Sequence, residues 1–305
     1  MSRPTKIWLI VAAALVILGI IIFVVVMTML NWKFLKLGTV KYETNSYEID
    51  ESFRNISIDV DTSDIIILPS DDGKVKVVCY ESIKEKHSVS VDNDTLIINT
   101  DDNRKWYDHI GIGFKSAKIT VYLPIIYIPE YNYLFLDIET STGGVDISRG
   151  FHFGRVDIET SIGVIKINGM SAGDVELSAS TGRIEISDII CENVEIEVST
   201  GKTKLANVKC RSLESEGNTG DISLIDVIVR EKIDIERSTG DVIFDSCDAA
   251  ELHIVTDTGD VKGSLLTAKI FIPRTDTGRI NVPKTTSGGV CEITTDTGNI
   301  IINIE

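Results

Sequence analysis

The sequence predicts an all-β chain, a single-chain parallel β-helix (β-solenoid) of about nine coils that follows an N-terminal transmembrane helix. Three observations support this prediction. A turn containing glycine recurs every 19 or 20 residues from residue 141 onward. Apolar and polar side chains alternate around each of these glycines, as in half-buried β-strands. A run of 24 residues near the N-terminus carries no charged side chain.

The uncharged run, residues 7–30, is predicted to be a single-pass membrane anchor. As a helix it is about 36 Å long, more than the roughly 30 Å hydrocarbon core of a bilayer. A signal peptide has a shorter apolar region and a cleavage site of small residues, whereas this run ends close to Trp32, which suits a membrane interface. Residues 1–6 form a short tail and residues 31–50 a linker. A short tail before a long body is typical of a signal anchor, so we expect the body to be extracellular.

Residues 135–305 are predicted to form the stacked coils. Positions two and four after each repeat glycine, and seven before it, are mostly apolar, so each repeat supplies at least two short strands joined at a glycine corner. One such unit cannot bury its apolar face alone, but coils stacked about 4.8 Å apart share a continuous core. A propeller blade needs about 40 residues, and an antiparallel sandwich is the alternative that the pattern leaves open. The repeat glycines are Gly143, Gly163, Gly182, Gly201, Gly220, Gly240, Gly259, Gly278 and Gly298.

Residues 51–134 are predicted to form an irregular β capping region. Strand-like runs, such as residues 56–60 and 119–123, alternate with turn signals such as Asp92-Asn93-Asp94. A bare solenoid end would expose unpaired strand edges, so a cap is expected there.

Four motifs stand out in the body: Ile-x-Ile-x-Val at residues 56–60, the strand at residues 96–98, Ile-x-Val-x-Leu-Pro ending at Pro124, and the Ser-Thr-Gly-x-Val/Ile repeats. Together they resemble the bacterial putative-adhesin family of β-strand repeat proteins. The resemblance covers about residues 50–305. It implies a β-solenoid ectodomain, often membrane-tethered, at the bacterial cell envelope and sometimes linked to its stress responses. The family has no defined catalytic residues, so the resemblance implies no chemistry.

The chain after the span is strongly acidic. It contains 28 basic and 46 acidic residues, a net charge of −18. This excess argues against binding to nucleic acid and against adhesion to anionic lipid. Cationic polymers, basic envelope proteins or metal ions are the partners that such a charge favours.

The strand before each corner carries carboxylates on its outward face, six and four residues before the glycine, on six successive coils with one gap at Ser178. Like charges on adjacent coils repel by about 1 kcal/mol each in water. We therefore expect bridging divalent cations such as Ca²⁺, a cationic polymer or basic protein along the face, or a solvated face that limits aggregation. After the corner, the outward residues Asp146, Lys166, Glu185 and Lys204 instead alternate in sign. The candidate binding residues are Asp137, Glu139, Asp157, Glu159, Glu176, Glu195, Glu197, Glu214, Glu216, Asp234 and Glu236.

Other motifs are interpreted as structural. Asp257, Asp276 and Asp296 each begin an Asp-Thr-Gly triplet, as in aspartic proteases, but Ser or Asn takes this position in other repeats. The triplet is therefore predicted to be the corner turn. The four histidines share no spacing, and the absence of a CxxC pair argues against zinc. We expect no catalytic residues, no cofactor and no firm metal site.

Two pairs are secondary candidates. Trp106 and Tyr107 lie in the most aromatic segment of the body, interpreted as a cap over an edge or as a partner hot spot. Cys191 and Cys210 each follow a repeat glycine by nine residues. We expect them on neighbouring coils with Cα atoms about 5 Å apart, either as buried ladder residues or as a disulfide.

Taken together, the residues favour a non-enzymatic binding, adhesion or scaffolding module on the bacterial cell membrane. An envelope-stress sensor that pairs with other membrane proteins is the first alternative. A polysaccharide-active β-helix enzyme is the second, although coils of 19–20 residues leave little length for the loops that would carry an active site.

Overall fold

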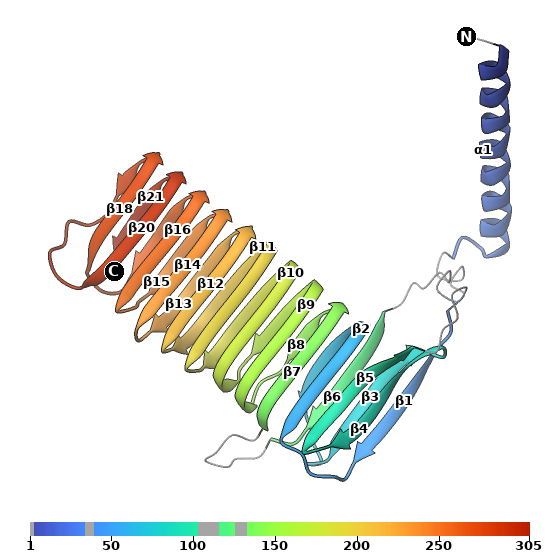
Figure 1. Cartoon of the computed structure of the whole chain (residues 1–305), viewed down its shortest axis with the longest axis horizontal. Helices are drawn as coiled ribbons and strands as arrows, with labels where there is room; N and C mark the ends of the chain where they lie inside the picture. The colour runs from blue at the N-terminus through green and yellow to red at the C-terminus, as the bar shows by residue number, and fades with distance from the viewer. Residues whose placement is uncertain (1–2, 34–39, 103–115, 126–132) are drawn as a thin grey trace.

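The computed structural model describes residues 3–33, 40–102, 116–125 and 133–305. Helix α1 (Arg3–Met29) begins the described chain and all the other described elements are β-strands (Figure 1). Among the described residues, α1 is long and apolar enough to cross a membrane, and its position near the N-terminus also suits a signal sequence. The helix covers almost all of the predicted span.

The strands form a parallel β-solenoid, which confirms the predicted fold class (Figure 1). We call the sheet before the glycine corners PB1 and the sheet after them PB2, and four long strands pass through a corner and belong to both. PB1 contains, along the axis, β4 (Glu85–Asp92), β5 (Thr95–Asp102), β2 (Asn55–Pro69), β7 (Tyr133–Thr142), β9 (His152–Asn168), β10 (Ser171–Ile190), β11 (Asn193–Cys210), β12 (Ser212–Thr219), β14 (Lys232–Thr239), β16 (Glu251–Thr258), β20 (Gly289–Thr297) and β18 (Lys269–Thr277). PB2 contains β1 (Tyr42–Ile49), β3 (Val75–Ser82), β6 (Ala117–Leu123), the second parts of β2, β9, β10 and β11, and β8 (Val145–Ile147), β13 (Ile222–Val229), β15 (Val242–Cys247), β17 (Val261–Leu265), β21 (Ile300–Ile304) and β19 (Ile280–Asn281).

The corner glycines stack with almost no space between coils. A Cβ atom built on Gly182 would lie 1.7 Å from the carbonyl oxygen of Gly163, and one on Gly201 would lie 1.7 Å from that of Gly182. Gly201 also has a φ of +153°, which side chains rarely adopt. The recurrence of glycine is therefore a steric requirement of stacking. Apolar side chains two residues after most corners, such as Ile165 and Ile184, are fully buried in the shared core, whereas Ile280 on the outermost coil is exposed.

A second corner lies six residues after the glycine and was not predicted. Asp188, Asn207, Asp226 and Ser246 occupy it with φ between 52° and 56°. Asn and Asp tolerate this left-handed conformation better than most residues. The Asn207 side-chain amide donates a 2.6 Å hydrogen bond to Asp188, which links neighbouring coils.

The order of the coils follows the sequence from β7 to β17 but departs from it at both ends. Thr297 of β20 pairs with Thr258 of β16 on one side and with Thr277 of β18 on the other, so the last coil of the chain lies inside the one before it. At the other end, β5 and β6 pair outside β2, although they follow it in sequence. The antiparallel strands β1, β3 and β4 extend the sheets there, and β1 falls in the stretch interpreted as a linker.

The first prediction concerns the corners. Gly182→Ala places a methyl group against the backbone of the neighbouring coil, so we expect it to lower the free energy of unfolding by about 1–3 kcal/mol, as overpacking does. Gly144→Ala is the matched control, because its Cβ would meet nothing closer than 3.4 Å. Chemical denaturation of the full chain in detergent measures both. Equal losses in the two variants would contradict the steric account.

The second prediction concerns the order of the last coils. We expect Thr258→Cys/Thr297→Cys to form a disulfide under mild oxidation, because these exposed residues are direct neighbours. Thr258→Cys/Thr277→Cys is expected to stay reduced, since one strand lies between them and two strand spacings are about 9.6 Å. Peptide mapping by mass spectrometry distinguishes the pairs. Crosslinking of the second pair alone would mean that the coils follow the sequence order.

Candidate functional site

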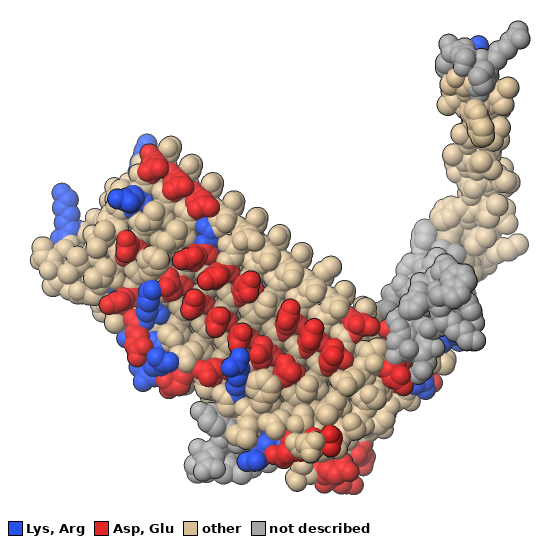
Figure 2. Space-filling view, in the orientation of Figure 1, with Lys and Arg blue, Asp and Glu red and all other residues tan. Residues whose placement is uncertain are grey.

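An acidic face follows the outer surface of PB1. We define it by the eleven predicted carboxylates, which strand pairing brings together in two columns (Figure 2). Asp59 of β2 pairs with Glu139 and extends the second column, a residue that the sequence analysis missed because its coil lies in the capping stretch. The first column is Asp137, Asp157, Glu176, Glu195, Glu214 and Asp234, and the second is Glu139, Glu159, Ser178, Glu197, Glu216 and Glu236.

Cations flank the acidic face near its two ends. Arg155 bonds Glu176 at 2.5 Å, and Lys232 hydrogen-bonds Asp234 at the other end. The first column then continues to His253, whose Nδ1 lies 2.7 Å from Asp234 Oδ1.

The centre of the acidic face lacks such ion pairs at its surface among the described residues. No ion pair involves Glu195, Glu197, Glu214 or Glu216 within the part of the chain that the structure describes, and all four side chains are exposed. The negative charge of this central part is therefore open to solvent or to a partner.

Two carboxylates of the acidic face have a pKa above the usual value. Partial burial raises the pKa of Glu195 above its usual value, and repulsion from Glu176, Glu214 and Glu216 adds to the shift. The pKa of Asp137 is raised in the same way, by burial first and then by its column neighbour Asp157. The acidic face therefore stores electrostatic repulsion at neutral pH.

PB2 has the opposite charge arrangement. Glu185 lies between Lys166 and Lys204 on neighbouring strands, so its outward column alternates in sign as predicted. Opposite charges across strands stabilise a sheet and like charges destabilise it. The repulsion is thus a property of PB1 rather than of an acidic chain in general.

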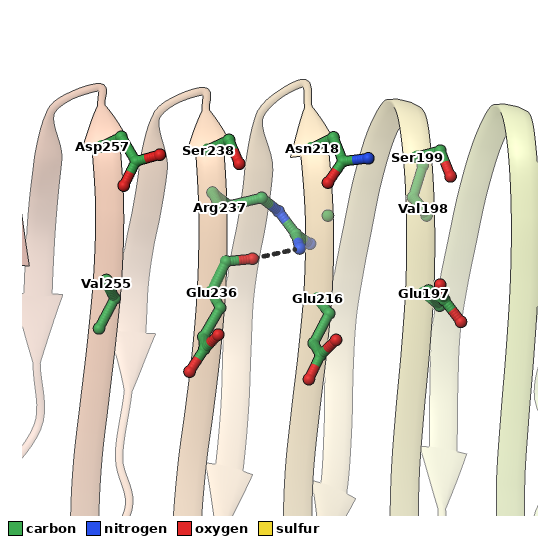
Figure 3. Close-up of a pocket in the computed structure, with 11 residues that line it drawn as sticks. Glu197, Val198, Ser199, Glu216, Asn218, Glu236, Arg237, Ser238, Val255 and Asp257 are labelled. Carbon is green, nitrogen blue, oxygen red and sulfur yellow. Dashed lines mark hydrogen bonds between the residues drawn. The ribbon is translucent and has the colours of Figure 1, made fainter.

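A shallow pocket of about 210 Å³ lies on the acidic face next to the corner turns (Figure 3). Its lining is mainly polar and includes hydroxyl and amide groups from three successive turns. A cationic side chain is the ligand that such a rim suits. The acidic residues of the lining are Glu197, Glu216, Glu236 and Asp257.

Arg237 also lines this pocket, and its side chain points across the neighbouring strand (Figure 3). It is 5% exposed, and its guanidinium donates to the Ser215 hydroxyl at 2.7 Å and to the Glu236 carbonyl at 2.9 Å. The residue that pairs with Arg237 on the neighbouring strand β12 is Gly217, and the absence of a side chain there leaves room for the guanidinium. Burial lowers the pKa of Arg237 to about 10, and the charge of Glu216 opposes this shift. A buried positive charge thus supports the acidic face from within.

Of the two secondary candidate pairs, the structure describes the cysteines but not the aromatic residues. Cys191 and Cys210 are buried free thiols on neighbouring coils, and a disulfide between them stays a prediction. Mutual hydrogen bonding and burial raise the pKa of Cys191. Trp106 and Tyr107 lie outside the described residues.

One polar cluster was missed by the sequence analysis. Ser63, at the corner of β2, places its hydroxyl 3.1 Å from His87 Nε2, and His87 Nδ1 lies 2.7 Å from Glu81 Oε2. These contacts match the connectivity of a Ser-His-Glu triad. However, the serine is 1% exposed and the cluster is enclosed, so a substrate has no access to the hydroxyl. The sequence does contain a signal for this cluster. Cys79 and Glu81 alternate onto one face of a strand, and a two-residue hairpin turn after that strand places His87 beside them.

These observations define the class of protein: a β-solenoid with an N-terminal apolar helix and an acidic outer sheet. Within that class, residues 53–302 match the Toastrack DUF4097 family, and the chain belongs to it. A comparison with curated proteins found no match.

Solved structures share the fold. A putative adhesin from Bacteroides fragilis NCTC 9343 is 18% identical with a TM-score of 0.51, over 86% of this chain and 97% of that one. A putative lipid binding protein from Parabacteroides distasonis ATCC 8503 is 14% identical with a TM-score of 0.55, over 87% of this chain and 98% of that one. At this identity the likeness concerns the fold alone.

The third prediction tests the stored repulsion. Glu195→Gln removes a carboxylate whose pKa is raised in the folded state, so it should stabilise the full chain at pH 7 by about 0.2–1 kcal/mol. A raised pKa means that the folded state binds more protons than the unfolded state. Stability from this group is therefore greatest below its unfolded pKa of about 4.3 and falls as the pH rises through the folded value. The variant should show a smaller loss of melting temperature between pH 4 and pH 7.

Glu185→Gln is the matched control. It removes one carboxylate from a column of alternating sign, so it should destabilise at pH 7. If both substitutions stabilised the chain, the stabilisation by Glu195→Gln would come from the lower net charge and not from relief of the stacked carboxylates on PB1.

Proposed function

We propose that this chain is a non-enzymatic, membrane-anchored binding module of the cell envelope, whose acidic face binds a cationic polymer or the basic segment of another envelope protein. The observation that carries the proposal is the unpaired centre of the acidic face, where Glu195, Glu197, Glu214 and Glu216 stack on two neighbouring coils. Such a face costs stability when it is bare, so a cationic partner gains binding energy by relieving the repulsion.

A linear partner suits this face better than dispersed ions do. Ca²⁺ prefers six to eight oxygen ligands that surround it, whereas the columns present exposed carboxylates from one side of a sheet. A flexible chain of positive charges can follow the columns along the solenoid axis. The pocket beside Glu216 and Glu236 gives one cationic side chain a defined position.

The anchor and the solenoid together suit presentation of this face. In the proposed arrangement α1 crosses the cell membrane once and the body lies outside, where envelope polymers and membrane proteins are available. The adhesin named among the solved structures shares the fold, which is compatible with a surface binding role. A stress sensor that binds a basic partner protein would use the same face.

The fourth prediction tests this function with fluorescein-labelled decalysine as the probe. We expect the full chain in neutral detergent to bind decalysine with an affinity that falls as NaCl rises, because the contacts are between exposed charges. Glu195→Gln/Glu197→Gln/Glu214→Gln/Glu216→Gln should weaken binding at least tenfold at low salt. Fluorescence anisotropy measures both effects.

The control variant removes four carboxylates from PB2 instead: Asp146→Asn/Glu185→Gln/Asp226→Asn/Asp245→Asn. It has the same net charge as the test variant and should bind decalysine nearly as well as the parent chain. Equal weakening in both variants would refute a specific role for the acidic face. A larger rise in melting temperature from CaCl₂ than from decalysine would favour the divalent ion as its ligand.

A further inference from the structure

The enclosed cluster at the N-terminal end of the solenoid contains three donors of the kinds that bind transition metals. Cys79 and Glu81 lie two residues apart on the same face of β3, and His87 lies on β4 of the adjoining hairpin. A thiol sulfur, a carboxylate oxygen and an imidazole nitrogen from these residues all lie within 4.8 Å of one another. All three side chains are buried, and Cys79 and Glu81 are fully so.

Further groups hold these donors in place. Asn45 donates a 2.5 Å hydrogen bond to Glu81 Oε1, and the backbone N–H of His87 donates to Oε2 at 2.7 Å. The Ser63 hydroxyl lies 3.1 Å from His87 Nε2, the ring nitrogen that faces away from Glu81. Metal-binding histidines and carboxylates are commonly oriented by such outer partners.

The charge of the cluster also suits a divalent cation. Glu81 is a carboxylate with no solvent exposure, and burying a charge is costly unless it is compensated. Lys86, on β4, already pairs with Glu43 at 2.5 Å and is half-exposed. One divalent ion with a thiolate, a carboxylate and a neutral imidazole gives a net charge of zero inside the protein.

We propose that Cys79, Glu81 and His87 bind one divalent transition-metal ion, with zinc as the best match. Zinc accepts sulfur, nitrogen and oxygen ligands together, whereas Ca²⁺ and Mg²⁺ prefer oxygen alone. On binding, the Cys79 thiol releases its proton to solvent and the sulfur bonds the metal. His87 Nδ1 loses its proton and its hydrogen bond to Glu81 and bonds the metal, while Nε2 takes up a proton from solvent, so the imidazole stays neutral; the Nε2–H then donates a hydrogen bond to the Ser63 hydroxyl.

Two other features clarify the proposal. Burial and the adjacent Glu81 charge raise the pKa of the Cys79 thiol to about 12, so the thiol is protonated without a metal.

Asp234, Glu236 and His253 also place donor atoms within 4.8 Å of one another, but Glu236 is exposed and Asp234 already bonds Lys232. The sequence argued against zinc because it has no CxxC pair, and the cluster needs none.

The experiment uses the full chain in detergent, loaded with Zn²⁺ or Co²⁺ and then desalted. We expect one retained Zn²⁺ per chain by elemental analysis and, with Co²⁺, a thiolate-to-metal charge-transfer band that Zn²⁺ abolishes. Cys79→Ala keeps the Glu81–His87 contact, so the variant should still unfold cooperatively. It should lose the Co²⁺ band and bind Zn²⁺ at least tenfold more weakly.

Two controls identify the site. Cys247→Ala removes a buried thiol that hydrogen-bonds the backbone carbonyls of Leu224 and Asp245, and should leave the Co²⁺ band unchanged. His253→Gln disrupts the exposed cluster and should leave Zn²⁺ retention unchanged. Absence of retained Zn²⁺, or equal retention in the parent chain and Cys79→Ala, would overturn the proposal. Decalysine binding is measured on the same samples and is independent of either result.

Discussion

Each corner glycine accommodates the backbone carbonyl of the corner residue on the neighbouring coil, which is Ser63 for Gly143 and a glycine for the others, in the space where a side chain would begin. This contact admits only hydrogen at the corner and leaves little freedom for one coil to slide against the next. A one-residue slip would also turn every apolar residue of a strand to the outside. The in-register columns on both sheets follow from this constraint, because residues at equal distances from the corner must lie directly above one another.

The same register makes the two sheets electrostatically different. On PB2, alternation of Glu185 with lysines turns stacking into attraction. On PB1, identical geometry places carboxylate above carboxylate, and Arg237 offsets part of that charge from inside the solenoid. The fold therefore sets the distance between charges, and the choice of residue at each outward position decides whether the interaction stabilises the sheet or leaves it open to a cationic partner.

Much of this could be predicted from the sequence because the repeat is regular. The glycine spacing and the period-two alternation specify the solenoid, and counting from the glycine places Glu195 above Glu214. The parts that escaped prediction depend on contacts without a period. Which coil pairs with β16 is ambiguous, since Asp276 and Asp296 begin identical triplets. His87 contacts Glu81 through a hairpin in the irregular capping region. The Arg237 side chain fits inside the solenoid because the residue beside it on the neighbouring strand, Gly217, has no side chain.

The placement of the last coil has a consequence for biosynthesis. Residues 289–304 supply the strands that cover β16 and β17, and they are synthesised after β18, which lies outside them. Until then the growing end has either an uncovered edge or a temporary pairing with β18, which the arriving segment must replace. Assembly of these last coils is therefore completed only after residues 289–304 have been translated. A protein fused at Glu305 would emerge one coil below the tip.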